Sequence, residues 1–200
     1  MSLLKNMEIL TPQDYLAWEK DQPSDVKHEY VNGDIYAMAG AKDAHVTVSG
    51  NLFALLRNHV RGSSCRVYMA DMKVHVETAN AFFYPDVVIT CDERDRQYDY
   101  YKKHPSLIIE VLSESTSAYD RGRKFAMYRQ LAELKEYVII DPDMMSVDCF
   151  RRDATDHWVL HPFVEQDRVE LTSVDFSTNM EAIYEDVAFP EAPENGEQIN

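Results

Sequence analysis

Residues 84–124 read YPDVVITCDERDRQYDYYKKHPSLIIEVLSESTSAYDRGRK, and this stretch decides the fold. It places Asp86 at the head of one apolar run and Glu110 in the middle of another, and Lys124 follows on the next expected helix. A carboxylate inside the run 107–112 is costly to bury unless a positive group lies beside it. The pattern therefore predicts that a metal ion, a basic side chain, or both share the site of Glu110.

Working outward from this stretch, the pattern predicts a mixed sheet with a parallel crossover. Strands are expected at 84–91 and 106–112, separated by a charged, aromatic-rich loop at 92–105. A helix at 118–134 and a buried strand at 136–142 follow. A strand, a helix and a second buried strand in this order are typical of a crossover unit.

The flanking segments predict further elements around this core. A short helix opens at Thr11-Pro12 and runs to Trp18, and Asn32-Gly33 predicts a hairpin with strands at 27–31 and 34–38. The remaining expectations are a helix at 43–61 capped by Gly62, strands at 66–70 and 73–77, and C-terminal strands within 145–171. We expect one α/β domain over residues 1–187, and then an acidic, disordered tail at 188–200.

Composition narrows the classes of function. With a net charge of −15, the protein lacks the extended basic surface of a general nucleic-acid binder. Any contact with nucleic acid must therefore be local. No apolar run reaches the ~18 residues of a membrane span, and the six glycines form no phosphate-binding loop. The spacing of Cys65, Cys91 and Cys149 fits no zinc motif and predicts reduced thiols in a cytoplasmic protein.

Each candidate residue also has a plain structural explanation. Glu110 could pair with a buried arginine or lie at the solvent-exposed end of its strand. Lys124 falls on the inward stripe of its helix near that strand, yet most lysines extend to water. Asp86 and Glu29 could be solvated acids, and a histidine such as His45 at a helix start more often packs or caps than binds a metal.

Several of these motifs together resemble the Uma-type endonuclease family of the restriction-endonuclease-like superfamily, which carries the PD-(D/E)XK motif. The resemblance rests on Glu29 in the early hairpin, His45 at the first long helix, Asp86 after proline, Glu110 in IIEVLS, and Lys124. It implies an αβββαβ core, here with an N-terminal helix and hairpin and extra C-terminal strands. It also implies DNA cleavage that depends on Mg²⁺ or Mn²⁺.

The resemblance assigns roles residue by residue. Asp86, Glu110 and Glu29 would hold the metal together with the Val111 carbonyl, and His45 is a further candidate ligand. Lys124 would complete the catalytic set. The usual superfamily motif would place lysine at position 112, where this chain has leucine, and the Uma-type lysine on the helix matches Lys124 instead.

Substrate contacts and assembly are more open. Aromatic and basic side chains that could stack on and neutralise nucleic acid are Tyr101, Lys102, Lys103, Arg121 and Arg123, although an exposed loop with solvated charges explains the first three equally. A homodimer is common in the superfamily, but no heptad pattern demonstrates one. The competing function is a non-catalytic module that keeps the fold for binding nucleic acid or protein.

Overall fold

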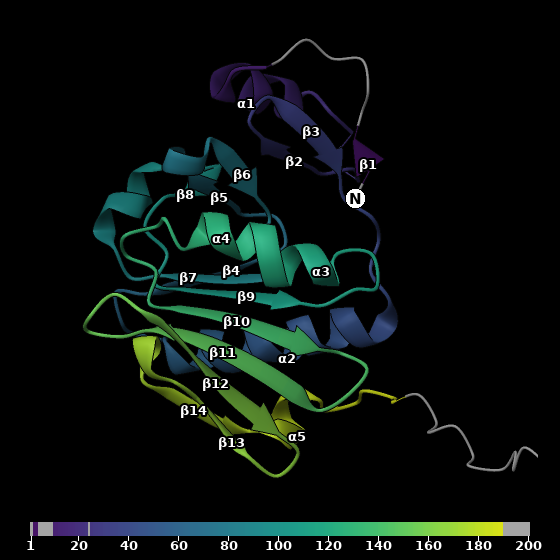
Figure 1. Cartoon of the computed structure of the whole chain (residues 1–200), viewed down its shortest axis with the longest axis vertical. Coiled ribbons are helices and arrows are strands. Elements are labelled where there is room, and N and C mark those ends of the chain that lie inside the picture. Colours follow the sequence, from purple (N-terminus) through teal and green to yellow (C-terminus); the bar gives the residue numbers. More distant parts are fainter. Residues whose placement is uncertain (1, 4–9, 24, 190–200) are drawn as a thin grey trace, which may run out of the picture.

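A mixed six-stranded sheet, called here the central sheet, carries the stretch that the sequence singles out (Figure 1). The structure is a computed structural model that describes residues 2–3, 10–23 and 25–189. In sheet order the strands are β12 (Trp158–Val164), β11 (Ser146–Arg152), β10 (Glu136–Asp141), β9 (Leu107–Val111), β7 (Val87–Thr90) and β4 (Arg66–Met69). Only β9 and β10 run parallel within it, so the predicted crossover is confirmed.

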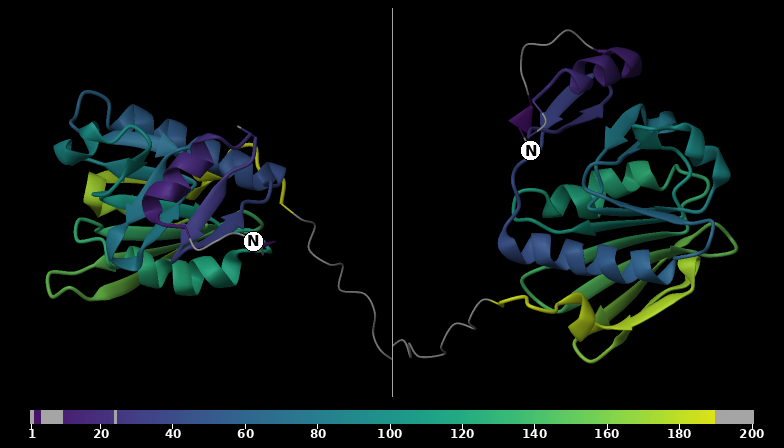
Figure 2. Two further views of the ribbon diagram at one scale, coloured as in Figure 1. Left: turned by 90° about the horizontal axis from the view of Figure 1, so that it is seen from above. Right: turned by 180° about the vertical axis from the view of Figure 1, so that it is seen from behind.

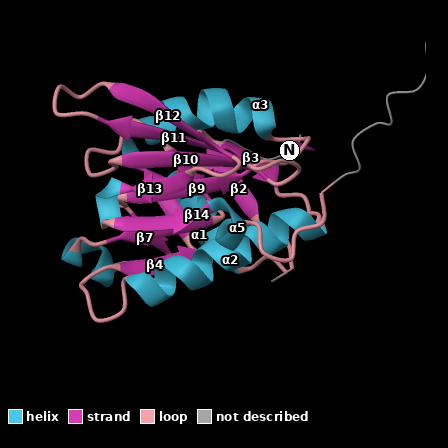
Figure 3. Ribbon diagram, turned by 90° about the horizontal axis from the view of Figure 1, so that it is seen from below, coloured by secondary structure: helices cyan, strands magenta, loops and turns pink. Residues whose placement is uncertain are grey.

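Helices cover both faces of the central sheet (Figure 3). The 17-residue helix α2 (Asp43–His59) packs Val48, Leu52 and Leu56 against one face. On the other face lies the segment made of α3 (Ser117–Tyr119), a π-helical turn (Asp120–Lys124) and α4 (Phe125–Tyr128). Side chains alternate along β9, which is apolar on both faces. Glu110 therefore points, like Ile108, toward the layer that contains Tyr128.

A second sheet, called here the N-terminal sheet, lies beyond this helical segment (Figures 1 and 2). Its strands in order are β1 (Ser2–Leu3), β3 (Asp34–Ala37), β2 (His28–Val31), β6 (Ala81–Phe83), β5 (Lys73–Val76) and β8 (Tyr101–Lys102). The predicted Asn32-Gly33 hairpin is present, with positive φ at both turn residues. Helix α1 (Pro12–Lys20) begins with a Thr11–Asp14 capping box and packs Tyr15 on this sheet.

The expected strand at 84–91 forms only over Val87–Thr90, as β7. Strand β6 ends in the N-terminal sheet and β7 begins in the central sheet, so residues 84–86 carry the chain from one to the other. Pro85 has no N–H to give to a ladder, which is the physical reason for a break there. The sheet change places Asp86 at the seam between the two sheets.

The helix expected at 118–134 is shorter than predicted, and a third layer was missed. It ends at Tyr128, and Leu131 and Leu134 are buried from a turn instead. A two-stranded sheet of β13 (Arg168–Leu171) and β14 (Phe176–Asn179), followed by α5 (Met180–Ile183), packs beside α2.

The cysteine prediction was wrong for two of the three residues. Strands β4 and β7 pair Arg66 with Thr90, which brings the next residues, Cys65 and Cys91, together in a disulfide. They are 26 positions apart in the sequence, so spacing alone does not reveal the pairing. Cys149 is free and buried, and burial raises its thiol pKa to about 12. The inference of a reducing compartment therefore loses its support at Cys65 and Cys91.

Two further expectations concern the chain ends and membranes. From residue 190 on, the predicted acidic tail lies outside the described residues, and the domain boundary at 187 stays a prediction. Among the helices that the structure describes, none has the length and apolar character needed to cross a bilayer.

Candidate active site

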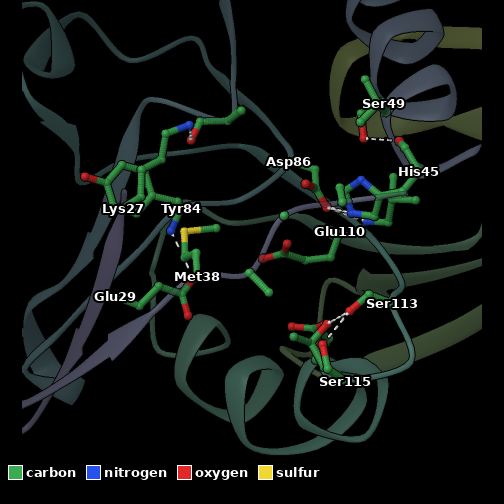
Figure 4. Close-up of a pocket in the computed structure, with 18 of the residues that line it drawn as sticks. Lys27, Glu29, Met38, His45, Ser49, Tyr84, Asp86, Glu110, Ser113 and Ser115 are labelled. Carbon is green, nitrogen blue, oxygen red and sulfur yellow. Dashed lines mark hydrogen bonds and ion pairs between the residues drawn. The ribbon is translucent and has the colours of Figure 1, made fainter. Parts of the chain in front are cut away.

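A cavity of about 380 Å³ opens at the seam of the two sheets, and the predicted catalytic side chains line it (Figure 4). Glu29 comes from β2, and Asp86 directly precedes β7. Glu110 comes from β9, and Lys124 from the π-helical turn. His45 reaches the cavity from the first turn of α2. Residues separated by up to 95 positions in the sequence thus line one pocket.

Lys124 is the centre of a buried ion-pair cluster. Its Nζ atom lies 2.9 Å from Glu110 Oε1, 3.0 Å from Glu29 Oε1 and 3.6 Å from Asp120 Oδ1. Its side chain is 6% exposed, so the ammonium does not extend to water. The structure therefore selects the inward orientation of Lys124 over the solvated one, and it gives Glu110 a lysine partner instead of an arginine.

The π-helical turn explains how acid and base meet. Asp120 and Lys124 stand four residues apart at its two ends, and both are buried. A π-turn widens the helix locally and occurs often at functional sites. Here it directs both side chains into the cluster, while Arg121 between them points outward and pairs with Asp148 at 2.6 Å.

Three carboxylates face one ammonium, so the cluster carries excess negative charge. Burial raises the pKa of Glu110 well above its usual range, and raises that of Glu29, against the opposing effect of Lys124. Burial alone would lower the pKa of Lys124, but Glu110 and Glu29 outweigh it and raise that pKa well above its usual value. Lys124 is therefore held as a cation, and an additional positive charge would be favoured beside Glu110.

Asp86 is held by the end of the neighbouring strand and by a histidine. Its Oδ2 atom accepts a hydrogen bond from the Val111 N–H at 2.8 Å and lies 3.3 Å from His45 Nε2. Burial lowers the pKa of His45, but Asp86 and the Val111 backbone outweigh this effect and raise it. The imidazole therefore lies directly against Asp86, one of the predicted metal ligands.

Sequence reasoning missed two residues that complete this site. Tyr128 donates a hydrogen bond from its hydroxyl to Glu110 Oε1 at 3.1 Å, and the Tyr84 N–H donates to Glu29 Oε1 at 3.1 Å. Tyr128 falls on the inward stripe of the helix that also carries Lys124. Its place four residues after Lys124 on the same helical face was the available signal.

The predicted substrate residues do not gather at this cavity. Lys102 is 4% exposed, and its ammonium donates to the carbonyls of Asp95 (2.9 Å) and Tyr98, so it anchors its own loop. Lys103 pairs with Glu77 at 2.9 Å. The prediction that Lys102 presents its charge to a substrate is therefore not supported, because a buried ammonium with carbonyl partners is unavailable.

The other predicted substrate residues lie elsewhere. Tyr101 is half-buried and packs its ring against His75 and Phe82. Arg123 is exposed and has no ion pair within the described part of the chain. Arg121, in contrast, is engaged by Asp148.

A separate group of potential metal ligands lies outside this cavity. Asp92, His104 and Glu133 each offer a ligand atom within 4.8 Å of the others. The Arg94 guanidinium lies 2.5 Å from both Asp92 and Glu133, so this group already contains a cation. We assign no ion to it.

The fold and the convergence of acids and lysine at a sheet seam define a restriction-endonuclease-like protein. A solved structure from Anabaena variabilis, described as a putative nuclease belonging to DUF820, is similar over 88% of this chain and 97% of its own, with a TM-score of 0.71 and 16% identity. The chain belongs to the Uma2 family, described as "putative restriction endonuclease", whose family model matches residues 12–181.

Two curated relatives come from Synechocystis. The uncharacterized protein slr1290 is 37% identical over 180 residues, which cover 90% of this chain and 94% of the relative. The uncharacterized protein sll1609 is 30% identical over 162 residues, which cover 80% of this chain and 90% of the relative.

Proposed function

We propose that the protein is a metal-dependent DNA endonuclease in which Asp86 and Glu110 hold the ion and Lys124 acts on the phosphate. The observation that carries this proposal is the cluster at the seam of the two sheets. There the buried Lys124 contacts Glu29 and Glu110, and Asp86 lines the same cavity. Membership in a family whose description reads "putative restriction endonuclease" supports the reaction class. The metal and the role of Lys124 are our inference from the donor set.

The residues present fit a hard divalent cation. Asp86 uses Oδ2 for Val111 and His45, and Glu110 uses Oε1 for Lys124 and Tyr128, so each retains an oxygen without such a contact to the described residues. Together with the Val111 carbonyl this is an all-oxygen set, which Mg²⁺ and Mn²⁺ prefer. When bound there, the ion would lower the pKa of a bound water and offset charge on phosphate oxygens.

The chain's own groups have distinct tasks in this proposal. Lys124 supplies a fixed positive charge beside Glu110, where it can stabilise the charge that develops on a phosphate oxygen. Glu29 contacts Lys124 at 3.0 Å and is fixed by the Tyr84 N–H. We therefore assign Glu29 to positioning the lysine in addition to its predicted place in the metal cluster. His45 orients Asp86, and burial of the cluster keeps these charges poorly screened.

The test is cleavage of plasmid DNA with Mg²⁺, with Mn²⁺ and with a chelator. We expect metal-dependent cleavage by the wild type, and a loss of about 100-fold or more in Asp86→Asn, Glu110→Gln and Lys124→Met. Asp92→Asn is the matched control, because it removes an acid outside the cavity. Cleavage that all variants share equally, or that ignores the chelator, contradicts the proposal.

The strong negative charge is the observation that favours the alternative, a non-catalytic binding module. Calorimetric titration of Mn²⁺ separates the two functions. A nuclease site binds the ion in a manner that Asp86→Asn weakens at least tenfold, whereas a module that only binds partners has no need of an ion at Asp86.

A further inference from the structure

A second cavity, of about 340 Å³, adjoins the candidate active site and is called here the side cavity. Lys27 and Tyr84 line both cavities, and Tyr84 stands two residues before Asp86. The close-up of the active-site cavity shows Lys27 and Tyr84 on one of its sides (Figure 4). A substrate strand bound at Asp86 can therefore continue past Tyr84 into the side cavity.

The side cavity contains a buried lysine that lacks an anionic partner. Lys73, the first residue of β5, is 8% exposed, and its ammonium lies 2.8 Å from the Tyr84 hydroxyl and 4.8 Å from the centre of that ring. No carboxylate of the described residues lies within 4.0 Å of it. Burial accordingly lowers the pKa of Lys73. A buried ammonium with one hydroxyl partner is costly, and an anion in the cavity would relieve that cost.

The nearest acid is already committed to other partners. Tyr84 donates its hydroxyl hydrogen to Glu19 Oε1 at 2.9 Å, so it can only accept from Lys73. Glu19 also accepts from the His28 N–H at 2.9 Å and lies 2.9 Å from His28 Nδ1. Glu19 also lines the side cavity, but its hydrogen bonds go to Tyr84 and His28, and Tyr84 is the one hydrogen-bond partner of the Lys73 ammonium among the described residues.

Aromatic rings and further lysines complete the lining. Tyr100 is 62% exposed, and Tyr101 also lines the cavity, although its ring already stacks on Tyr98. Lys20 and Lys27 add positive charge, and Glu19 and Asp71, which also line the cavity, offset part of it, Asp71 by pairing with Lys27. An ammonium for a phosphate and tyrosine faces for a base are the two elements that single-stranded nucleic-acid sites combine.

We propose that the side cavity binds one nucleotide of the substrate strand next to the scissile phosphate, with its phosphate at Lys73 and its base against the exposed ring of Tyr100. The assignment to a substrate strand rests on the proposed nuclease function. The recognition of a nucleotide does not, because it follows from the lining of this cavity alone.

The binding test uses the full-length protein in the presence of a chelator, so that it is independent of cleavage. Thymidine 5′-monophosphate, thymidine and inorganic phosphate are titrated by calorimetry. We expect the nucleotide to bind the wild type at least tenfold more tightly than thymidine or phosphate, and at least tenfold more weakly to Lys73→Met. Lys135→Met is the matched control, an exposed lysine outside both cavities, and stays within twofold of the wild type.

A second variant separates base from phosphate recognition and guards against misfolding. Tyr100→Ala alters an exposed side chain, and we expect it to weaken the nucleotide at least threefold while phosphate binding is unchanged. Equal binding by Lys73→Met and Lys135→Met overturns the proposal. So does a Tyr100→Ala variant that binds the nucleotide as tightly as the wild type.

Cleavage of an oligonucleotide then distinguishes failure of the side cavity from failure of the nuclease proposal. We expect Lys73→Met to raise KM at least tenfold with kcat within twofold, because a contact made before and during the reaction contributes uniform binding. Nucleotide binding without any cleavage refutes the nuclease function but supports the side cavity. Cleavage with an unchanged KM in Lys73→Met refutes the side cavity alone.

Discussion

Replacing Lys124 by methionine tests whether the buried cluster is ionised as described. The substitution keeps the unbranched side chain up to the position of Cε and removes an ammonium that lies within 3.0 Å of Glu29 and Glu110. All three side chains are 6% exposed or less, so water cannot solvate the acids left behind. Removing one partner of a buried pair costs about 3–5 kcal/mol. We expect the free energy of unfolding at pH 8 to fall by this amount.

The assay is urea unfolding followed by circular dichroism, with a double-mutant cycle. Glu110→Gln in the Lys124→Met background removes one of the unpaired buried charges and should recover about 2 kcal/mol, whereas in the wild-type background it should destabilise. Lys135→Met, an exposed control, should change the free energy of unfolding by less than about 0.5 kcal/mol. If Lys124→Met is as stable as the wild type, or if the two substitutions add without coupling, the ionised cluster is refuted.

Three further predictions concern stability outside the cavity. Burial would raise the pKa of Glu136, but its hydrogen bonds from Ser173 and Arg151 outweigh burial and lower it. The ionised Glu136 therefore adds to the free energy of unfolding above the ordinary glutamate pKa of about 4.3, and this stabilisation is lost as the pH falls below that value. Glu136→Gln should lower the free energy of unfolding by about 2 kcal/mol at pH 7 and make it depend less on pH in the acid range. Reduction of the Cys65–Cys91 disulfide, which closes a loop of 26 residues, should lower the unfolding free energy by about 3 kcal/mol in urea titrations, and a reductant should have no such effect on Cys65→Ser. Lys102→Met should speed limited proteolysis within residues 92–106, because the ammonium ties two carbonyls of that loop, and an unchanged cleavage rate would contradict this anchoring role.

Much of the central sheet could be predicted because its signals are local. The alternation along β9 placed Glu110 on the face of Ile108, and Asn32-Gly33 fixed the hairpin that carries Glu29. The inward stripe of the following helix also gave the direction of Lys124 correctly. Each of these inferences depends only on residues that are close together in the sequence.

The features that were missed depend on contacts between distant segments. The disulfide follows from the β4–β7 register, and the burial of Lys102 follows from a loop that closes on itself. The helix end at Tyr128 was missed because the residues after it are good helix formers, and tertiary packing of Leu131 and Leu134 overrides that preference. The alternation Val169, Leu171 could have revealed β13, since both are buried between exposed neighbours.

The seam at Glu29 and Lys124 has a consequence for biosynthesis. Glu29, on a strand of the N-terminal sheet, is made early in translation, and Lys124, on the π-helical turn that packs on the central sheet, emerges 95 residues later. A ribosome-bound or truncated chain thus lacks a competent centre until both halves have docked.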